Sequence, residues 1–176
     1  MAVTRLISID DAAPLARLVT ANRGYLAPWS PLQDDHYFTE AGQQAMLARD
    51  LGVYQRGGML PLAILDSGGA VCGRINVNNV VRGAAQCASL GYWVSESHIG
   101  RGLASAAVAD AVRAGFGELG LHRLEAATLL HNTPSQRVLR RNGFRPYAVS
   151  EAYLKIAGWW QDHILFALLN PEPRAR

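Results

Sequence analysis

Three apolar segments separated by short glycine-containing turns occupy the middle of the chain and restrict its fold most strongly. Residues 59–65, 70–81 and 86–94 are rich in apolar and β-branched residues, and the turns DSGG and RGAA lie between them. Such segments joined by short turns predict neighbouring antiparallel strands. An amphipathic segment follows at 103–119, with apolar residues at the spacing of one helical face. The sequence therefore predicts a strand meander followed by a helix, in a mixed α/β order.

Further helices and strands are predicted on both sides of this central block, from apolar periodicity bounded by Pro, Gly, Asn and Asp. Strands are expected at 4–9, 123–130 and from about 144, with a closing hairpin of 153–156 and 162–168, and helices at about 11–22, 39–55 and 134–141. Residues 22–35, which contain Pro28 and Pro31, are predicted to form a loop.

The length and composition fit one compact domain. A chain of 176 residues with 49% apolar residues can bury a substantial core. No repeat or low-complexity tract divides it, so residues 1–170 are expected to form a single domain with a short polar tail at 171–176. The start lacks the pattern of a signal peptide, and the apolar run 164–169 is too short to cross a bilayer, so a cytoplasmic protein without membrane contact is expected.

The polar residues argue against several classes of site. Cys72 and Cys87 have no cysteine or histidine partner at a ligand spacing, and the histidines form no HxxxH or HExxH pattern, so no metal site is predicted. The net charge of +3 is spread along the chain, which argues against a nucleic-acid-binding surface. Lys155 is the only lysine, and the GxxxxGK motif of phosphate-binding loops is absent.

Two glycines flank Arg101 at the point where a predicted strand is followed by a helix. The first N–H groups of a helix are unpaired and carry partial positive charge, and glycine lets an anion approach them closely. Gly100 and Gly102 therefore predict a phosphate-binding turn, with a tight turn that binds nothing as the alternative.

A dinucleotide-binding site is a second interpretation of these glycines. Ser105 occupies the third small position of the GxGxxG pattern, and Glu125 lies near the position of a ribose-binding acid. However, Glu125 falls at the start of its predicted strand, and the strands before the glycines are predicted to be antiparallel. Both features disfavour the dinucleotide-binding fold.

Two neighbouring segments carry a family resemblance. GYWVSESHIGRGLASAAV and LEAATLLHNTPSQRVLRRNGF resemble the acetyl-CoA-binding half of the GCN5-related N-acetyltransferases, the GNAT superfamily. The family pattern R/Q-x-x-G-x-G/A falls on residues 99–104, with Ile99 in place of Arg or Gln, and the Asn-x-x-Ser pattern is intact at 132–135. The resemblance implies a central, mostly antiparallel sheet of about seven strands with flanking helices and a cofactor cleft between the middle strands.

The resemblance also implies residue roles around acetyl-CoA. Strand residues pair with the pantetheine arm, the glycine turn holds the pyrophosphate, Asn132 bonds the pantetheine, and Ser135 serves as general acid for the departing thiolate. The residues assigned to the cofactor in this way are Trp93, Val94, Ile99, Gly100, Arg101, Gly102, Leu103, Ala104, Asn132 and Ser135. For Ser135, capping of a helix N-terminus is an alternative role that is compatible with catalysis.

Two further segments are similar to one branch of the family. NRGYLAPWSP and AYLKIAGWWQDHILFAL resemble the substrate loop and closing hairpin of the Rim-type ribosomal-protein N-terminal acetyltransferases. The resemblance assigns Asn22, Leu26 and Trp29 to the acceptor, with ordinary packing as the alternative for the tryptophan. It implies transfer of acetyl from acetyl-CoA to the N-terminal α-amine of a protein. Many relatives dimerise, so a homodimer is a further implied partner.

A general base is the least determined part of this prediction. Rim-type enzymes can place a glutamate just before the Tyr-Leu pair, where this chain has Glu151 displaced by one position. A solvated loop carboxylate is the alternative, and Glu96 and His131 acting through water are weaker candidates. An α-amine, with a pKa near 8, is roughly a tenth neutral at pH 7 and needs less help from a base than lysine does. Acetylation of a small-molecule amine and a non-catalytic acetyl-CoA-binding module remain alternatives.

Overall fold

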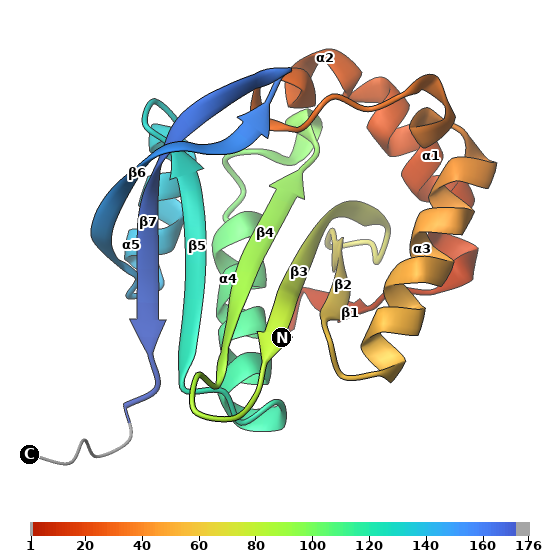
Figure 1. Ribbon diagram of the computed structural model, residues 1–176. Helices are drawn as coiled ribbons and strands as arrows, with labels where there is room; N and C mark the ends of the chain where they lie inside the picture. Colours follow the sequence, from red (N-terminus) through yellow and green to blue (C-terminus); the bar gives the residue numbers. More distant parts are fainter. Residues whose placement is uncertain (1, 172–176) are drawn as a thin grey trace, which may run out of the picture.

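The computed structural model describes residues 2–171 and contains a seven-stranded mixed sheet over that range (Figure 1). The strands are β1 (Thr4–Leu6), β2 (Leu60–Leu65), β3 (Val71–Val81), β4 (Cys87–Val94), β5 (Arg123–Leu129), β6 (Arg145–Ile156) and β7 (Trp159–Leu169). Their order across the sheet is β1-β2-β3-β4-β5-β7-β6. Only the β4/β5 pair is parallel. This arrangement confirms the predicted mixed α/β fold with its largely antiparallel sheet.

The helices cover both faces of this sheet (Figure 1). They are α1 (Ala12–Ala21), α2 (Arg23–Leu26), α3 (Glu40–Gln55), α4 (Leu103–Arg113) and α5 (Thr133–Arg141), with short helical turns η1 (Ile9–Asp11), η2 (Ala27–Trp29), η3 (Asp35–Phe38), η4 (Glu96–His98) and η5 (Ala114–Glu118). The helices α1 and α3 pack together over β2 and β3, and α4 and α5 pack together over β3, β4 and β5. Across the described residues, no helix is both long and apolar enough to span a bilayer.

Alternation along the strands separates two apolar cores, one on each face. Leu62 and Ile64 of β2 belong to the larger core with α4 and α5, whereas Ala63 between them belongs to the smaller core with α1 and α3. Successive side chains of a strand point to opposite faces, so a single run of apolar residues serves both layers. The fully buried rings of Phe144 and Phe166 complete the larger core.

Local capping explains two differences from the predicted elements. The predicted strand 4–9 ends at Leu6, because Ser8 begins a capping box in which the Asp11 carboxylate accepts the Ser8 N–H at 2.8 Å. The predicted loop 22–35 instead contains α2 and η2, where Pro28 occupies the first turn of a helix, a position that tolerates proline. Of the predicted tail 171–176, residues 172–176 lie outside the described range.

The strands β4 and β5 pair only over their first halves. Residues 87–90 pair with residues 123–126, and β4 then continues along β3 as far as the Val94 and Gly73 pair. Beyond Ala126, β5 continues along β7 to the Leu129 and His163 pair. The sheet therefore opens between its two middle strands, where the resemblance places a cofactor cleft.

A close contact at Gly73 holds β3 against the free end of β4. A Cβ atom at this position would lie 2.3 Å from the Trp93 carbonyl oxygen and 3.0 Å from the Val94 Cα. Both atoms belong to the backbone, so an added methyl group forces the two strands apart at the opening of the sheet.

We predict that Gly73→Ala lowers the free energy of unfolding by about 1–3 kcal/mol, because of this overpacking. Urea denaturation measures the change. Gly24→Ala is the matched control, since a Cβ there has nothing within 4 Å. Equal stability of Gly73→Ala and the wild type would contradict the tight β3–β4 contact.

Candidate active site

Two cavities meet at the free end of β4. One, of about 470 Å³, is bounded by β4, α4 and α5, and the other, of about 900 Å³, by β3, β4 and α3. Both are lined by Leu26, Trp29, Tyr92 and Trp93. We call these four residues the junction. Because Tyr92 and Trp93 are neighbours in a strand, they point to opposite sides of the sheet, and the cavities approach each other from those two sides.

The glycine turn before α4 forms one wall of the smaller cavity. Gly100 and Gly102 have φ angles of +75° and +79°, in the left-handed region that favours glycine. A Cβ atom at either position would have nothing within 4 Å, so the backbone borders open space. Gly102 caps α4 without any side-chain hydrogen bond, which leaves the first N–H groups of the helix available to a ligand. The turn therefore fits an anionic group.

Cationic side chains face this turn from α5. Arg137 and Arg141, spaced four residues apart on one helical face, line the smaller cavity together with His98. The two arginines were not predicted from the sequence, although their spacing and the helical face that they share with Pro134 and Val138 indicate them. Of the six residues predicted at the turn, Ile99, Gly100, Gly102, Leu103 and Ala104 line the cavity, whereas Arg101 does not.

An unsatisfied hydroxyl adds a second sign of a ligand at this wall. The Ser105 Oγ atom is buried and has no hydrogen-bond partner, and Ser105 lines the smaller cavity. Leaving a buried hydroxyl unpaired costs about 1–3 kcal/mol, which a ligand oxygen could offset. Bare N–H groups, two arginines and this hydroxyl together suit a phosphate-bearing molecule.

A tyrosine and a serine form a hydrogen-bonded pair beside the junction. The Tyr92 hydroxyl lies 2.8 Å from the Ser135 Oγ, and Asn132 caps α5 by accepting the Ser135 N–H at 3.2 Å. Burial raises the pKa of Tyr92 to about 12, against the smaller opposing effect of the Ser135 hydrogen bond. The tyrosine therefore stays protonated at neutral pH. Tyr92 was missed, although its alternation with buried Leu90 and Val94 places it on this face.

The loop residues predicted to contact the acceptor have different positions. Leu26 and Trp29 belong to the junction, and the Trp29 ring lies 5.5 Å from the His131 ring, centroid to centroid. Asn22 lines neither cavity. Its buried side chain donates to the Leu18 carbonyl and accepts the Glu96 N–H, both at 2.8 Å, so it ties the end of α1 to the segment after β4. Asn22 thus positions the loop.

The predicted base is not brought to the junction. Glu151 lies exposed on β6 and lines neither cavity, and the same cavities lack Glu96 and His131 among their lining residues. The strand bulges at this point, where Ala152 has a φ of +45° and donates its N–H to Asp162 at 2.9 Å. In residues 2–171, no group of three or more His, Cys, Asp or Glu side chains could hold a metal ion.

Comparisons with known proteins identify the family of this chain. A family model described as an acetyltransferase (GNAT) domain matches residues 3–145. The Escherichia coli [ribosomal protein uS5]-alanine N-acetyltransferase is 33% identical over 171 residues, which cover 97% of this chain and 88% of that protein.

Solved structures show the same fold. The Mycobacterium smegmatis RimJ in complex with CoA-disulfide has a TM-score of 0.91 and 34% identity, covering 94% of this chain and 80% of that one. The ribosomal-protein-S5-alanine acetyltransferase from Vibrio fischeri also has a TM-score of 0.91, with 28% identity and coverage of 98% and 94%. This chain belongs to the GNAT acetyltransferases and is an N-acetyltransferase of the RimJ and RimL type.

Proposed function

We propose that this chain transfers acetyl from acetyl-CoA to the N-terminal α-amine of a protein, with a cytoplasmic ribosomal protein as the acceptor. The observation that carries the proposal is the pair of cavities that meet at Tyr92 and Trp93 from opposite sides of the sheet. One cavity suits a phosphate-bearing donor, and the other has a polar wall suited to a peptide. The names of the uS5-alanine acetyltransferases among its relatives support this choice of acceptor.

The smaller cavity fits acetyl-CoA. The backbone of residues 100–104 would hold the pyrophosphate, the Ser105 hydroxyl would donate to a phosphate oxygen, and Arg137 and Arg141 would neutralise phosphate charge. Acetyl-CoA supplies an acetyl thioester, which an amine attacks directly with loss of the thiolate. Because the pyrophosphate would be held by backbone N–H groups of this turn, Ile99 in place of a polar side chain leaves the pyrophosphate site intact.

Ser135, beside the junction, supplies the proton needed by the departing thiolate, together with Tyr92 of the junction. The Ser135 hydroxyl holds a proton beside the junction and can draw a replacement from the Tyr92 hydroxyl 2.8 Å away. Asn132 fixes the backbone of Ser135 through the helix cap, so the hydroxyl is positioned before any ligand binds. The edge of β4 at Trp93 and Val94, which β5 no longer covers, can pair with an extended ligand.

An α-amine matches a site without a carboxylate at the junction. About a tenth of an α-amine with a pKa near 8 is neutral at pH 7, against about 4 parts in 10,000 for a lysine side chain. The acceptor can therefore bind already neutral, and its second proton can pass to water. This proposal assigns no catalytic role to Glu151.

The proposal is tested by incubating the protein with acetyl-CoA and a panel of amines, followed by intact-mass and fragmentation analysis. The panel contains peptides with ribosomal-protein N-termini, the same peptides blocked at the α-amine, free amino acids and polyamines. Acetylation of only the unblocked peptides is expected. Acetylation confined to small amines would overturn the proposed acceptor, and binding of acetyl-CoA without turnover would identify a non-catalytic module.

We predict that Ala104→Glu abolishes acetyl-CoA binding, because it places a carboxylate at the wall where the pyrophosphate is held. The dissociation constant from calorimetry is expected to rise at least about a hundredfold, or about 2.7 kcal/mol. Ala106→Glu, on the same helix but outside the cavity lining, is the control. Unchanged affinity of Ala104→Glu for acetyl-CoA would contradict binding of the pyrophosphate at residues 100–104.

We predict that Ser135→Ala lowers kcat by about 10²- to 10⁴-fold, and that Tyr92→Phe lowers it by a smaller factor, because the tyrosine acts through the serine. The double variant should be no slower than Ser135→Ala alone, as expected of groups that act as a unit. Steady-state kinetics with a thiol readout measures all three. Independent, multiplicative losses in kcat would contradict the shared role.

We predict that kcat/KM for a peptide acceptor rises with pH up to about 8 and then stays level to about pH 10. The rise reflects loss of the ammonium proton. The plateau follows because the raised pKa of Tyr92, about 12, keeps its hydroxyl protonated over this range. Rates measured with saturating acetyl-CoA test both the rise and the plateau. A decrease in kcat/KM between pH 8 and 10 would indicate a proton donor that is more acidic than Tyr92.

A further inference from the structure

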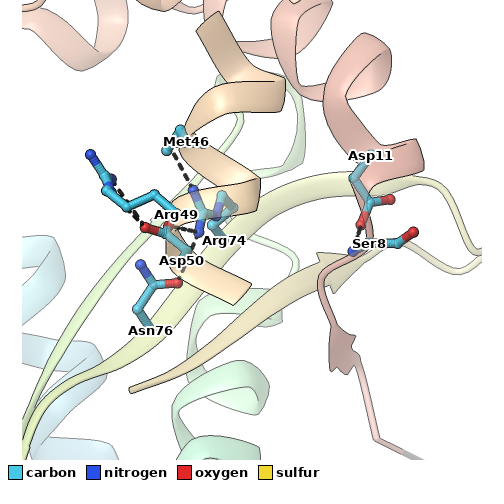
Figure 2. A network of polar contacts seen from close by, with 7 residues as sticks. All are labelled: Ser8, Asp11, Met46, Arg49, Asp50, Arg74 and Asn76. Carbon is cyan, nitrogen blue, oxygen red and sulfur yellow. Dashed lines mark hydrogen bonds and ion pairs between the residues drawn. The ribbon is translucent and has the colours of Figure 1, made fainter. Parts of the chain in front are cut away.

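The wall of the larger cavity is polar where a helix-covered sheet face is normally apolar. Along β3, Ile75 and Val77 are buried in the larger core, whereas Arg74, Asn76 and Asn78 point to the opposite face and line the cavity. Helix α3 lies over this face, and its residues at helical spacing, Met46, Arg49, Asp50 and Val53, line the same cavity. Figure 2 shows Met46, Arg49 and Asp50 of this helix beside Arg74 and Asn76 of β3. The polar face of β3 and this face of α3 therefore enclose the larger cavity, which side chains do not fill.

Arg49, Asp50 and Arg74 form an ion cluster in this wall. The Asp50 carboxylate accepts from Arg74 at 2.8 Å, and both side chains are buried. Its other oxygen accepts from Arg49 at 3.0 Å. The Arg74 guanidinium also donates to the Met46 sulfur at 3.1 Å and to the side-chain Oδ1 atom of Asn76 at 3.4 Å. Two guanidinium groups share one carboxylate, so the cluster carries one excess positive charge.

The cluster has hydrogen-bond donors left over. The Arg74 side chain is only 7% exposed, and its Nε atom is buried without a hydrogen-bond partner. Arg49, with 70% of its side chain exposed, has guanidinium N–H groups that Asp50 does not use. The other carboxylate that lines the cavity, Asp34, accepts the Tyr37 N–H at 2.9 Å and caps η3. The Arg49 donors are open to solvent at the cavity and can bind an oxygen-bearing, anionic ligand group.

We propose that Arg49, Asp50 and Arg74 form an acceptor subsite that binds a carboxylate side chain within the first few residues of the acceptor peptide. This inference rests on the proposed function. With the α-amine at the junction, the peptide would lie along Asn76 and Asn78, whose side-chain amides would hydrogen-bond to backbone groups of the peptide. Arg49 would then make a charge-assisted contact with the carboxylate, and the buried Arg74–Asp50 pair would hold the neighbouring wall in place.

Peptides that differ at one position test the subsite. Four-residue to six-residue acceptors carry Glu, Gln or Lys at position 2, 3 or 4, with all other residues fixed. For the wild type, kcat/KM at one position is expected to be about fivefold higher with Glu than with Gln, and lower still with Lys, mainly through KM. Added salt should reduce the Glu preference, because the Arg49 contact is partly exposed.

Arg49→Glu provides the sharper test, because it reverses the charge at the cavity and leaves the Asp50–Arg74 pair present. The Glu-over-Lys preference should disappear or reverse, while the affinity for acetyl-CoA stays the same. Arg17→Glu is the matched control for net charge, since Arg17 is exposed on α1 and lines neither cavity. It should keep the wild-type preference.

The outcomes separate the subsite from the proposed function. Equal kcat/KM for the Glu, Gln and Lys peptides in the wild type, or a preference that Arg49→Glu does not change, would overturn the subsite while peptide acetylation stands. Failure to acetylate any peptide, with acetyl-CoA still bound, would overturn the proposed function and the subsite with it.

Discussion

Strands β4 and β5 share a ladder over residues 87–90 and 123–126 and then separate, each held by its other neighbour. An extended strand that loses its partner keeps unpaired backbone groups, and here these groups face the interior of the molecule and not its rim. The opening places the free edge of β4 between α4 and α5 on one side and α3 on the other. Both cavities, and the four junction residues that line both, depend on this separation.

The two faces of the sheet then provide different chemistry. On the α4 and α5 face, left-handed glycines, bare helix N–H groups and two arginines suit phosphate. On the α3 face, amides and an ion cluster suit a polypeptide. Tyr92 and Ser135 stand where the two meet, so a donor and an acceptor can be aligned without any change in the fold.

Local patterns predicted the parts of the fold that depend on neighbours in sequence. The strand meander and α4 follow from apolar periodicity and turn chemistry. Of the residues that the GNAT resemblance assigns to acetyl-CoA, all but Arg101 line the smaller cavity. Contacts between distant segments could not be predicted in this way. Tyr92 and Ser135 are 43 residues apart, and Asp50 and Arg74 are 24 apart. The side chain of Asn22 accepts a hydrogen bond from the N–H group of Glu96, which lies 74 residues away. Glu151 illustrates the same limit, because a bulge in β6 decides where its side chain lies.

The central claim is that donor and acceptor occupy opposite sides of β4 and react through the gap beside β5. A crystal structure with a bisubstrate analogue, in which CoA is joined through an acetyl bridge to the α-amine of an acceptor peptide, tests it most directly. The account predicts the CoA part between α4 and α5, the bridge beside Tyr92 and Ser135, and the peptide over β3 beneath α3. A peptide that lies on the same side as CoA, with the cavity beneath α3 empty, would contradict it.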